Sequence, residues 1–470
     1  MAVAANEIQF TRRLASFAAK LRPEHIPPNV MWKARQLFAD YVCTAAAAVS
    51  EEPARKLQML AKALGGTGAG IIGTDIQVAA PWAALVNGAM GHMAEMDDTH
   101  RGTMSHPGDS LWAVALALTT ADSDSKAFLT ATIAGYEVAL RIGEAVMPDH
   151  YQRGWHTSGT IMAFGSAVTA ALLLNLDADQ IGWSLGTAGA QASGNFAHLT
   201  ERAMTKDFNC GHAAKSGVIA ALLAREGFTG PSDVLENAKG FMRLYGDRIF
   251  PERLVQDLGR SWRILEVAHK PYSCCRHIHA SLDALQAIIV KNNVTTADVA
   301  GVTARIFSTG AAYVNDPHPW TPGKGLQGAR FSAQLNLAVL LLWGQPGLLR
   351  MMSSAGTMAA LQSPDLREVM RSINVVSDDE LDTNFPDQWA SIVIVRDHAG
   401  REFSHRVDYP LGEPEFPMSE QQLFDKFSQL LSQAGWSKSR VEGTWDAMAQ
   451  PSAPFDLRTV FTSIFTPRHE

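Results

Sequence analysis

Long segments rich in alanine and glycine, with larger apolar residues three or four positions apart, recur from the N-terminus to about residue 265. Examples are VMWKARQLFADYVCTAAAA, LWAVALALTTA and GTIMAFGSAVTAALLLNL. This spacing places the apolar residues on one face of a helix, and small side chains let neighbouring helices approach closely. The pattern predicts a compact bundle of helices. A solenoid is disfavoured because no fixed repeat period is evident.

The pattern changes after about residue 266, where β-rich segments appear at 302–307 and 373–376. Residues 391–395 and 403–409 flank a short turn sequence, DHAG, which predicts a β-hairpin. Helical patterns persist at 333–343 and 364–372, and the tail SEQQLFDKFSQLLSQAG is again helical. The predicted fold is therefore mainly α. It has a large all-helical bundle domain, residues 1–265 and 412–470, and a smaller α+β domain, residues 266–411.

The composition of the chain indicates which binding partners and which cellular compartment to expect. A net charge of −7 argues against a broad nucleic-acid or anionic-membrane surface. Four cysteines in 470 residues form no disulfide framework, and charged residues interrupt the apolar start of the chain. The longest uncharged stretch, Gly154 to Leu176, carries Thr, Ser and Gly and predicts a buried helix. We expect a cytoplasmic protein without a membrane or nucleic-acid partner.

Four predicted helix starts carry a basic or titratable side chain: His106, His156, Lys206 and Lys270. Asp109 or Ser110 is the expected N-cap after His106, and Asn209 the expected N-cap after Lys206. A helix N-terminus offers free N–H groups and a partial positive charge, so it attracts anions. If these four ends converge, they would bind a small molecule with several carboxylates.

The segment GHMAEMDDTHRGTMSHPGDS concentrates polar residues, and the helix that begins near Pro81 is expected to end at Asp97–Asp98–Thr99. Its carboxylates and histidines are Glu95, Asp97, Asp98, His92, His100 and His106. Their spacing matches no established metal-ligand signature, although a metal site stays an alternative. The carboxylates could instead orient a catalytic imidazole or bind a substrate hydroxyl. The adjacent thiols Cys274 and Cys275 are too few for a local iron–sulfur cluster, and we predict no metal or cofactor.

Short motifs in a fixed order resemble those of the MmgE/PrpD family. They are MDDT at 96–99, HP at 106–107, GWHTSGT at 154–160, MTK at 204–206, EGFTGP at 226–231, KPYSCCR at 270–276 and ARFS at 329–332. The family includes 2-methylcitrate dehydratase, cis-aconitate decarboxylase and iminodisuccinate epimerase. The resemblance implies a helical domain built from both chain ends, an α+β lid domain, a homodimer, cofactor-free chemistry and an active site between the domains.

At matching positions the family's site residues correspond to Thr99, His106, His156, Lys206 and Lys270. From the resemblance and the helix starts together, we predict four catalytic residues: His106, His156, Lys206 and Lys270. The predicted substrate-binding residues are Glu95, Asp97, Thr99, Arg276 and His277. The chain departs from the family at Glu95, where Asp is more frequent. It also has Cys275 and Leu335 where animal cis-aconitate decarboxylases carry His and Tyr, which weakens that assignment.

The predicted function is a cofactor-independent lyase acting on a small di- or tricarboxylate, with dehydration of the 2-methylcitrate or citrate type favoured. His106 is expected to transfer the proton, oriented by Glu95 or by Asp97 and Asp98. The other three basic residues would hold carboxylates and stabilise the developing charge. Alternatives are a cis-aconitate-type decarboxylase, an iminodisuccinate-type epimerase, a metal-dependent lyase or hydrolase, and a polycarboxylate-binding protein without catalysis.

Overall fold

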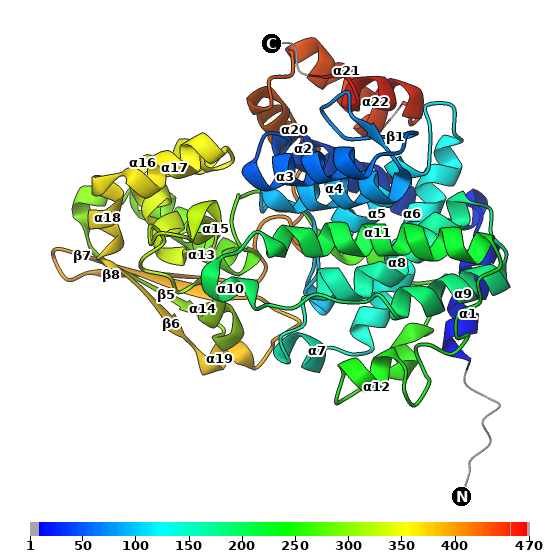
Figure 1. Ribbon diagram of the computed structural model, residues 1–470. Helices are drawn as coiled ribbons and strands as arrows, with labels where there is room; N and C mark the ends of the chain where they lie inside the picture. The colour runs from blue at the N-terminus through cyan, green and yellow to red at the C-terminus, as the bar shows by residue number, and fades with distance from the viewer. Residues whose placement is uncertain (1–8, 452, 468–470) are drawn as a thin grey trace, which may run out of the picture.

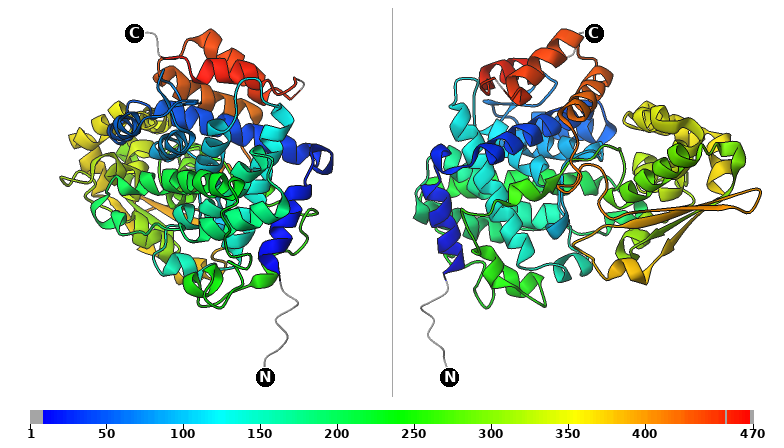
Figure 2. Two further views of the ribbon diagram at one scale, coloured as in Figure 1. Left: turned by 45° about the vertical axis from the view of Figure 1, so that its right-hand side comes forward. Right: turned by 180° about the vertical axis from the view of Figure 1, so that it is seen from behind.

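The computed structural model describes residues 9–451 and 453–467. It has a large helical part and a smaller part in which helices pack on a four-stranded sheet, as predicted (Figure 1). The C-terminal helices lie beside the N-terminal ones, so both chain ends build the helical part (Figure 2). None of the helices in the described ranges has the length and apolar character that crossing a membrane requires.

Within the described residues, fifteen α-helices from both ends of the chain make up the helical part. They are α1 (Phe10–Lys20), α2 (Pro28–Ala47), α3 (Glu52–Leu64), α4 (Ala80–Met93), α5 (Pro107–Ala117), α6 (Ser125–Glu144), α7 (Asp149–Gln152), α8 (Thr157–Leu173), α9 (Ala178–Gly189), α10 (His198–Glu201), α11 (Thr205–Arg225), α12 (Phe241–Tyr245), α20 (Glu420–Gln433), α21 (Lys438–Ala449) and α22 (Leu457–Ile464). The predicted buried helix at 154–176 is α8, whose residues from Thr157 to Ala171 are all buried.

Small residues allow α6, α8 and α11 to pack closely, as the composition predicts. A Cβ added at Gly135 of α6 would lie 2.1 Å from Thr169 Oγ1 of α8. A Cβ at Gly217 of α11 would lie 2.3 Å from the Cβ of Ser166, also of α8. Both separations are far below van der Waals contact, so the helices can take this arrangement only with glycine at these positions.

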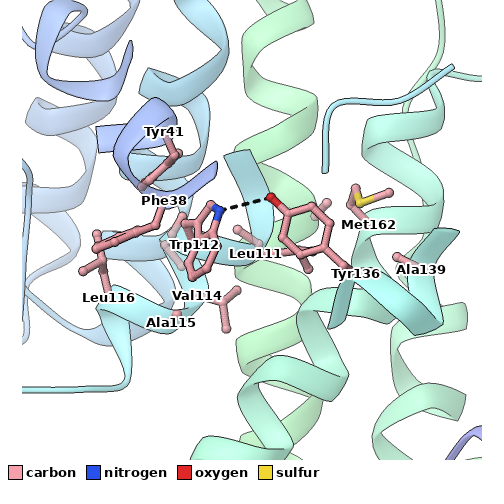
Figure 3. Packing of buried hydrophobic residues seen from close by; sticks show 14 of the residues in the cluster. Phe38, Tyr41, Leu111, Trp112, Val114, Ala115, Leu116, Tyr136, Ala139 and Met162 are labelled. Atoms are coloured by element: carbon pink, nitrogen blue, oxygen red, sulfur yellow. Dashed lines mark hydrogen bonds between the residues drawn. The ribbon is translucent and has the colours of Figure 1, made fainter. Parts of the chain in front are cut away.

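Aromatic side chains fill the centre of the helical core and reach toward the polar segment at 95–110. Trp112 Nε1 donates a hydrogen bond to the Tyr136 hydroxyl at 3.0 Å (Figure 3). Tyr136 in turn donates to Asp98 Oδ2 at 2.8 Å. A buried indole and a buried phenol therefore both have partners, and the core is linked directly to the carboxylate-rich segment.

The smaller part is built on a sheet of strand order β6-β5-β7-β8. Its strands are β5 (Val299–Ile306), β6 (Ile373–Ser377), β7 (Ser391–Asp397) and β8 (Glu402–Val407), and its helices are α13 (Arg276–Asn292), α14 (Ser308–Val314), α15 (Gly325–Arg330), α16 (Ala333–Met351), α17 (Ser354–Gln362), α18 (Pro364–Met370) and α19 (Asp379–Asp382). β5 runs parallel to β6 and antiparallel to β7. The predicted hairpin is confirmed as β7 and β8.

Two short antiparallel ladders lie outside the four-stranded sheet. One pairs β1 (Ala69–Gly70) with β2 (Gln77–Val78). The other pairs β3 (Thr99–His100) with β4 (Val267–Ala268). The second ladder brings Thr99 beside the segment that leads to Lys270, although the two are far apart in sequence. The domain limits, residues 1–265 with 412–470 and residues 266–411, stay a prediction.

Three predicted helix boundaries in the helical part are wrong. α4 ends at Met93 rather than at Asp97–Thr99, because Glu95 takes a left-handed backbone conformation (φ +53°) that ends the turn. α5 begins at Pro107, since proline suits the first helical position, and Asp109 lies inside the first turn instead of capping it. α11 begins at Thr205, so Asn209 is an internal residue and not the N-cap.

The close packing of α6 against α8 predicts opposite effects for two glycine substitutions. Gly135→Ala should lower the free energy of unfolding by at least about 1–3 kcal/mol, because the added methyl overlaps Thr169. Gly182→Ala on α9 is the matched control, since a Cβ there meets nothing within 4 Å. It should raise stability by about 0.5–1 kcal/mol through helix propensity. Urea denaturation measures both, and equal effects would contradict this packing.

Candidate active site

A cavity of about 550 Å³ of empty space lies between the helical part and the smaller part. Its lining includes all four basic residues predicted at helix starts: His106, His156, Lys206 and Lys270. The predicted residues Glu95, Thr99, Arg276 and His277 also line it, together with Met104, Tyr151, Phe196, His198, Leu199, Cys275, Tyr313, Phe331 and Trp389. The structure thus brings together every predicted site residue except Asp97, which lies behind His106.

Helix N-termini position two of the basic side chains. His106 is the N-cap residue of α5, and His156 is the N-cap residue of α8. The backbone N–H of His106 donates to Ser158 Oγ at 2.9 Å, which joins the two helix starts. Lys206 lies in the first turn of α11, whereas Lys270 lies between β4 and α13. Partial positive charge from several helix ends therefore faces one cavity.

His106 and Asp97 form a hydrogen-bonded pair. His106 Nδ1 lies 2.7 Å from Asp97 Oδ2 and 2.9 Å from the backbone carbonyl of Asp98. Because Nδ1 is engaged, Nε2 is the ring nitrogen left for a ligand in the cavity. Of the carboxylates considered from the sequence, Asp97 is the one that contacts His106. This is the arrangement by which a carboxylate orients an imidazole for proton transfer.

Two lysines and two carboxylates form a network of ion pairs at the wall of the cavity. Lys206 Nζ lies 2.5 Å from Glu95 Oε1, while Lys270 Nζ lies 3.5 Å from both Glu95 Oε2 and Asp97 Oδ1. Burial alone would raise the pKa of Asp97, but His106, Lys270 and His92 hold it well below its ordinary value. Both carboxylates and both ammonium groups are therefore charged, and their formal charges cancel.

Glu95 bridges the two lysines with one carboxylate oxygen each. Burial would raise its pKa, but Lys206 and Lys270 hold it below the ordinary range. Its φ of +53° is uncommon for a residue with a side chain and costs on the order of 1 kcal/mol or more. The ion pairs offset that cost, since an unpaired carboxylate at this depth would be far more expensive.

His92 connects the two halves of this network. Its Nδ1 lies 2.8 Å from Asp97 Oδ2, and its Nε2 lies 2.6 Å from Lys206 Nζ. Burial, together with the Lys206 charge, lowers the pKa of His92 to about 3. The imidazole is therefore neutral, donating through Nδ1 to Asp97 and accepting from the lysine through Nε2.

The cavity histidines other than His106 are also neutral at physiological pH. Burial lowers the pKa of His198 to about 4 and that of His277 to about 3, and it holds the pKa of His156 well below its ordinary value. The Asn209 side-chain amide donates to His156 Nδ1 at 2.9 Å, which leaves the ring proton on Nε2. His156 is thus a neutral donor facing the cavity.

Four buried polar atoms of the cavity lining have no hydrogen-bond partner within the described chain: Thr99 Oγ1, His198 Nε2, His277 Nδ1 and Trp389 Nε1. Buried polar groups are normally paired, and these four atoms are free to bind a molecule in the cavity. The sequence analysis missed His198 and Trp389. His198 begins the single-turn helix α10, and Trp389 precedes β7 without any helix-start signal.

Arg276 is engaged with the protein rather than open to a ligand. Its guanidinium donates to Glu413 Oε1 at 2.9 and 3.1 Å, to the Leu411 carbonyl at 3.0 Å and to His279 Nδ1 at 2.8 Å. These contacts fix the start of α13 to the chain segment that returns to the helical part. Its role in substrate binding stays a prediction.

One of the three groups of potential metal ligands in the described chain, His92, Asp97 and His106, is too close together for an ion at its centre. His92 Nδ1 and His106 Nδ1 lie 2.8 and 2.7 Å from the same oxygen of Asp97, which are hydrogen-bond distances. Ligand atoms around a tetrahedral zinc, bound at about 2.0–2.1 Å, lie roughly 3.3 Å apart. A metal would therefore require these three residues to separate, and in this arrangement they do not fit one.

Two family models and several known proteins match most of the chain. The model of the MmgE/PrpD N-terminal domain matches residues 12–251, and that of the MmgE/PrpD C-terminal domain matches residues 272–446. A cis-aconitate decarboxylase of Aspergillus terreus is 24% identical over 443 residues, 89% of each chain. Human cis-aconitate decarboxylase is 27% identical over 368 residues, 75% of this chain and 73% of the human protein. A cis-aconitate decarboxylase-like protein of Aspergillus oryzae is 26% identical over 59% of this chain, which spans 61% of that relative.

The lowered pKa of His198 predicts a pH-dependent cost in stability. Below about pH 6.5 the unfolded chain binds a proton at this histidine, but the folded protein does not until about pH 4. The free energy of unfolding should therefore fall with decreasing pH, relative to His198→Gln, by about 1.4 kcal/mol per unit. Denaturation at several pH values between 7 and 4.5 measures this. The exposed His405→Gln is the control and should follow the wild type, and parallel curves for all three would contradict the assignment.

Proposed function

Because the chain belongs to the MmgE/PrpD family, we propose that it is a cofactor-independent lyase acting on a small di- or tricarboxylate. The favoured reaction is dehydration of a citrate-type or 2-methylcitrate-type acid. The observation that carries the proposal is the His106–Asp97 pair, which adjoins two buried lysines in the same cavity. A homodimer and a cytoplasmic location stay predictions.

The proposed dehydration begins with proton removal. His106 Nε2 takes a proton from the carbon next to a substrate carboxylate, and Asp97 stabilises the imidazolium that forms. Negative charge then builds up on that carboxylate, where Lys206 and Lys270 stabilise it. As the C=C bond forms, the C–O bond to the neighbouring hydroxyl breaks, and the hydroxyl leaves as water with a proton from one of the cavity ammonium groups, Lys206 or Lys270. Neutral His156 holds the leaving oxygen by a hydrogen bond from Nε2.

A second candidate is decarboxylation, supported by the names of the relatives. Here the C–C bond to a carboxylate breaks, CO₂ leaves, and a protonated His106 returns a proton to the carbon. Burial raises the pKa of Cys275, which lines the cavity, to about 11, so its thiol is protonated and neutral. Because animal decarboxylases carry a histidine at this position, the thiol favours dehydration. Epimerisation removes the α-proton and returns a proton to the opposite face of the same carbon, and it is a third outcome of the same chemistry.

The role of His106 predicts a large loss of turnover on substitution. His106→Asn should lower kcat by about 10²- to 10⁴-fold, and Asp97→Asn by about 10²-fold, since each removes part of one acid–base unit. NMR in D₂O with citrate, 2-methylcitrate, cis-aconitate and iminodisuccinate measures water loss, CO₂ loss and proton exchange together. His405→Asn, on the exposed face of β8, is the control.

The outcomes of this screen separate the candidates. Near wild-type turnover in His106→Asn would exclude its catalytic role. Tight binding of these acids to the wild type, with neither turnover nor deuterium uptake, would favour a binding protein instead.

The cofactor-independent proposal predicts that metal removal has no effect. Dialysis against a chelator should leave the turnover rate unchanged, because the His106–Asp97 pair and the lysines supply acid–base and charge stabilisation themselves. Elemental analysis of the purified protein should find less than one metal ion per chain. Loss of activity on chelation, restored by a divalent cation, would favour the metal-dependent alternative.

A further inference from the structure

The face of the cavity formed by the smaller part carries two polar atoms that the proposed chemistry does not use. Trp389 and His277 are 4% and 5% exposed, and both line the cavity. Trp389 Nε1 and His277 Nδ1 have no hydrogen-bond partner in the described chain. An indole nitrogen is a donor only, and leaving it unpaired when buried is unfavourable. An unpaired buried donor is expected at a site where a bound ligand supplies the missing hydrogen-bond partner.

Packing fixes the positions of both rings. The rings of His277 and Trp389 meet edge to face, with centroids 4.7 Å apart. Phe307, which is fully buried, contacts His277 at 5.1 Å and Trp389 at 6.2 Å between ring centroids. The hydroxyls of Ser281 on α13 and Ser391 on β7 are hydrogen-bonded at 2.7 Å, which joins the helix that carries His277 to the strand that begins two residues after Trp389. Neither ring can turn its unpaired nitrogen toward another partner without disrupting this packing.

The surroundings of the pair determine what it can bind. Tyr151, Phe196 and Tyr313 form an adjoining aromatic wall, with ring centroids 4.9 to 5.8 Å apart. The wall supplies no charge, and burial lowers the pKa of His277 to about 3, so the pair is neutral in the free protein. The indole N–H can only donate, and a neutral imidazole has one donor and one acceptor nitrogen, so the pair suits an oxygen that accepts from the indole, with apolar contact on either side.

We propose that Trp389 and His277 form a second recognition site in the cavity, which binds an oxygen acceptor on the substrate arm remote from the carbon that His106 handles. This proposal rests on the proposed function, which places the reacting carbon of the substrate next to His106. It narrows the substrate class to acids with a third oxygen-bearing arm. An acid with only two carboxylates leaves the indole N–H unpaired, so the site discriminates against it.

A comparison of two inert ligands tests this site by calorimetry. Propane-1,2,3-tricarboxylate has three oxygen-bearing arms, whereas 2-ethylsuccinate replaces one of them with an ethyl group. Trp389→Phe keeps an aromatic ring and removes only the N–H donor. It should weaken binding of the tricarboxylate about 5- to 100-fold and change binding of 2-ethylsuccinate less than about twofold. His277→Asn should act in the same direction and serves if the first variant is unstable.

Trp320→Phe is the matched control, because Trp320 lies in the smaller part but does not line the cavity, and it should leave both affinities unchanged. Equal weakening of both ligands by Trp389→Phe would indicate lost packing and overturn the proposal, as would no weakening of either. Binding requires no turnover, so the two proposals fail separately. If Trp389→Phe weakens binding of the tricarboxylate selectively but the wild type converts no acid, the lyase proposal fails and the recognition site stands.

Discussion

The mutual neutralisation of two buried lysines and two buried carboxylates is the constraint on which the site depends. Lys270 is fully buried and Lys206 is 5% exposed, and neither would stay charged there alone. Removing one member of a buried ion pair costs about 3–5 kcal/mol, because the other charge is left uncompensated. The end of α4, the start of α11 and the segment after β4 are therefore forced to meet, and the cavity forms where they meet.

The C-terminal tail supports this network from behind. Lys426 of α20 is buried and donates to Asp40 Oδ1 and to the Met96 carbonyl, both at 2.5 Å. Met96 lies between Glu95 and Asp97, so a residue near the end of the chain fixes the backbone that presents both carboxylates. This contact gives a physical reason why α20 packs beside α2 in the helical part. If α20 did not pack there, the segment that carries Glu95 and Asp97 would lose the hydrogen bond from Lys426.

Sequence reasoning found the parts of the site that have local signals. His106 and His156 directly precede helices that begin with Pro107 and Thr157, and those starts follow from proline preference and apolar spacing. The helix start predicted at Lys270 is wrong, because α13 begins six positions later at Arg276, although Lys270 does line the cavity. The left-handed turn at Glu95 and the unpaired indole of Trp389 depend on contacts with distant residues, which no local pattern reports.

The balance of charge also bears on how such a site selects anions. Lys206 and Lys270 are already paired in the free protein, so a substrate carboxylate must share them with Glu95 and Asp97. The neutral hydrogen-bond donors of the cavity lining, by contrast, have no carboxylate partner in the described chain. A bound polyanion raises the pKa of the histidines among them. Total charge on the ligand is then a weak criterion for binding. The site then selects a ligand by where the ligand carries its oxygen acceptors. Those oxygens must match the fixed positions of the rings and hydroxyls that line the cavity.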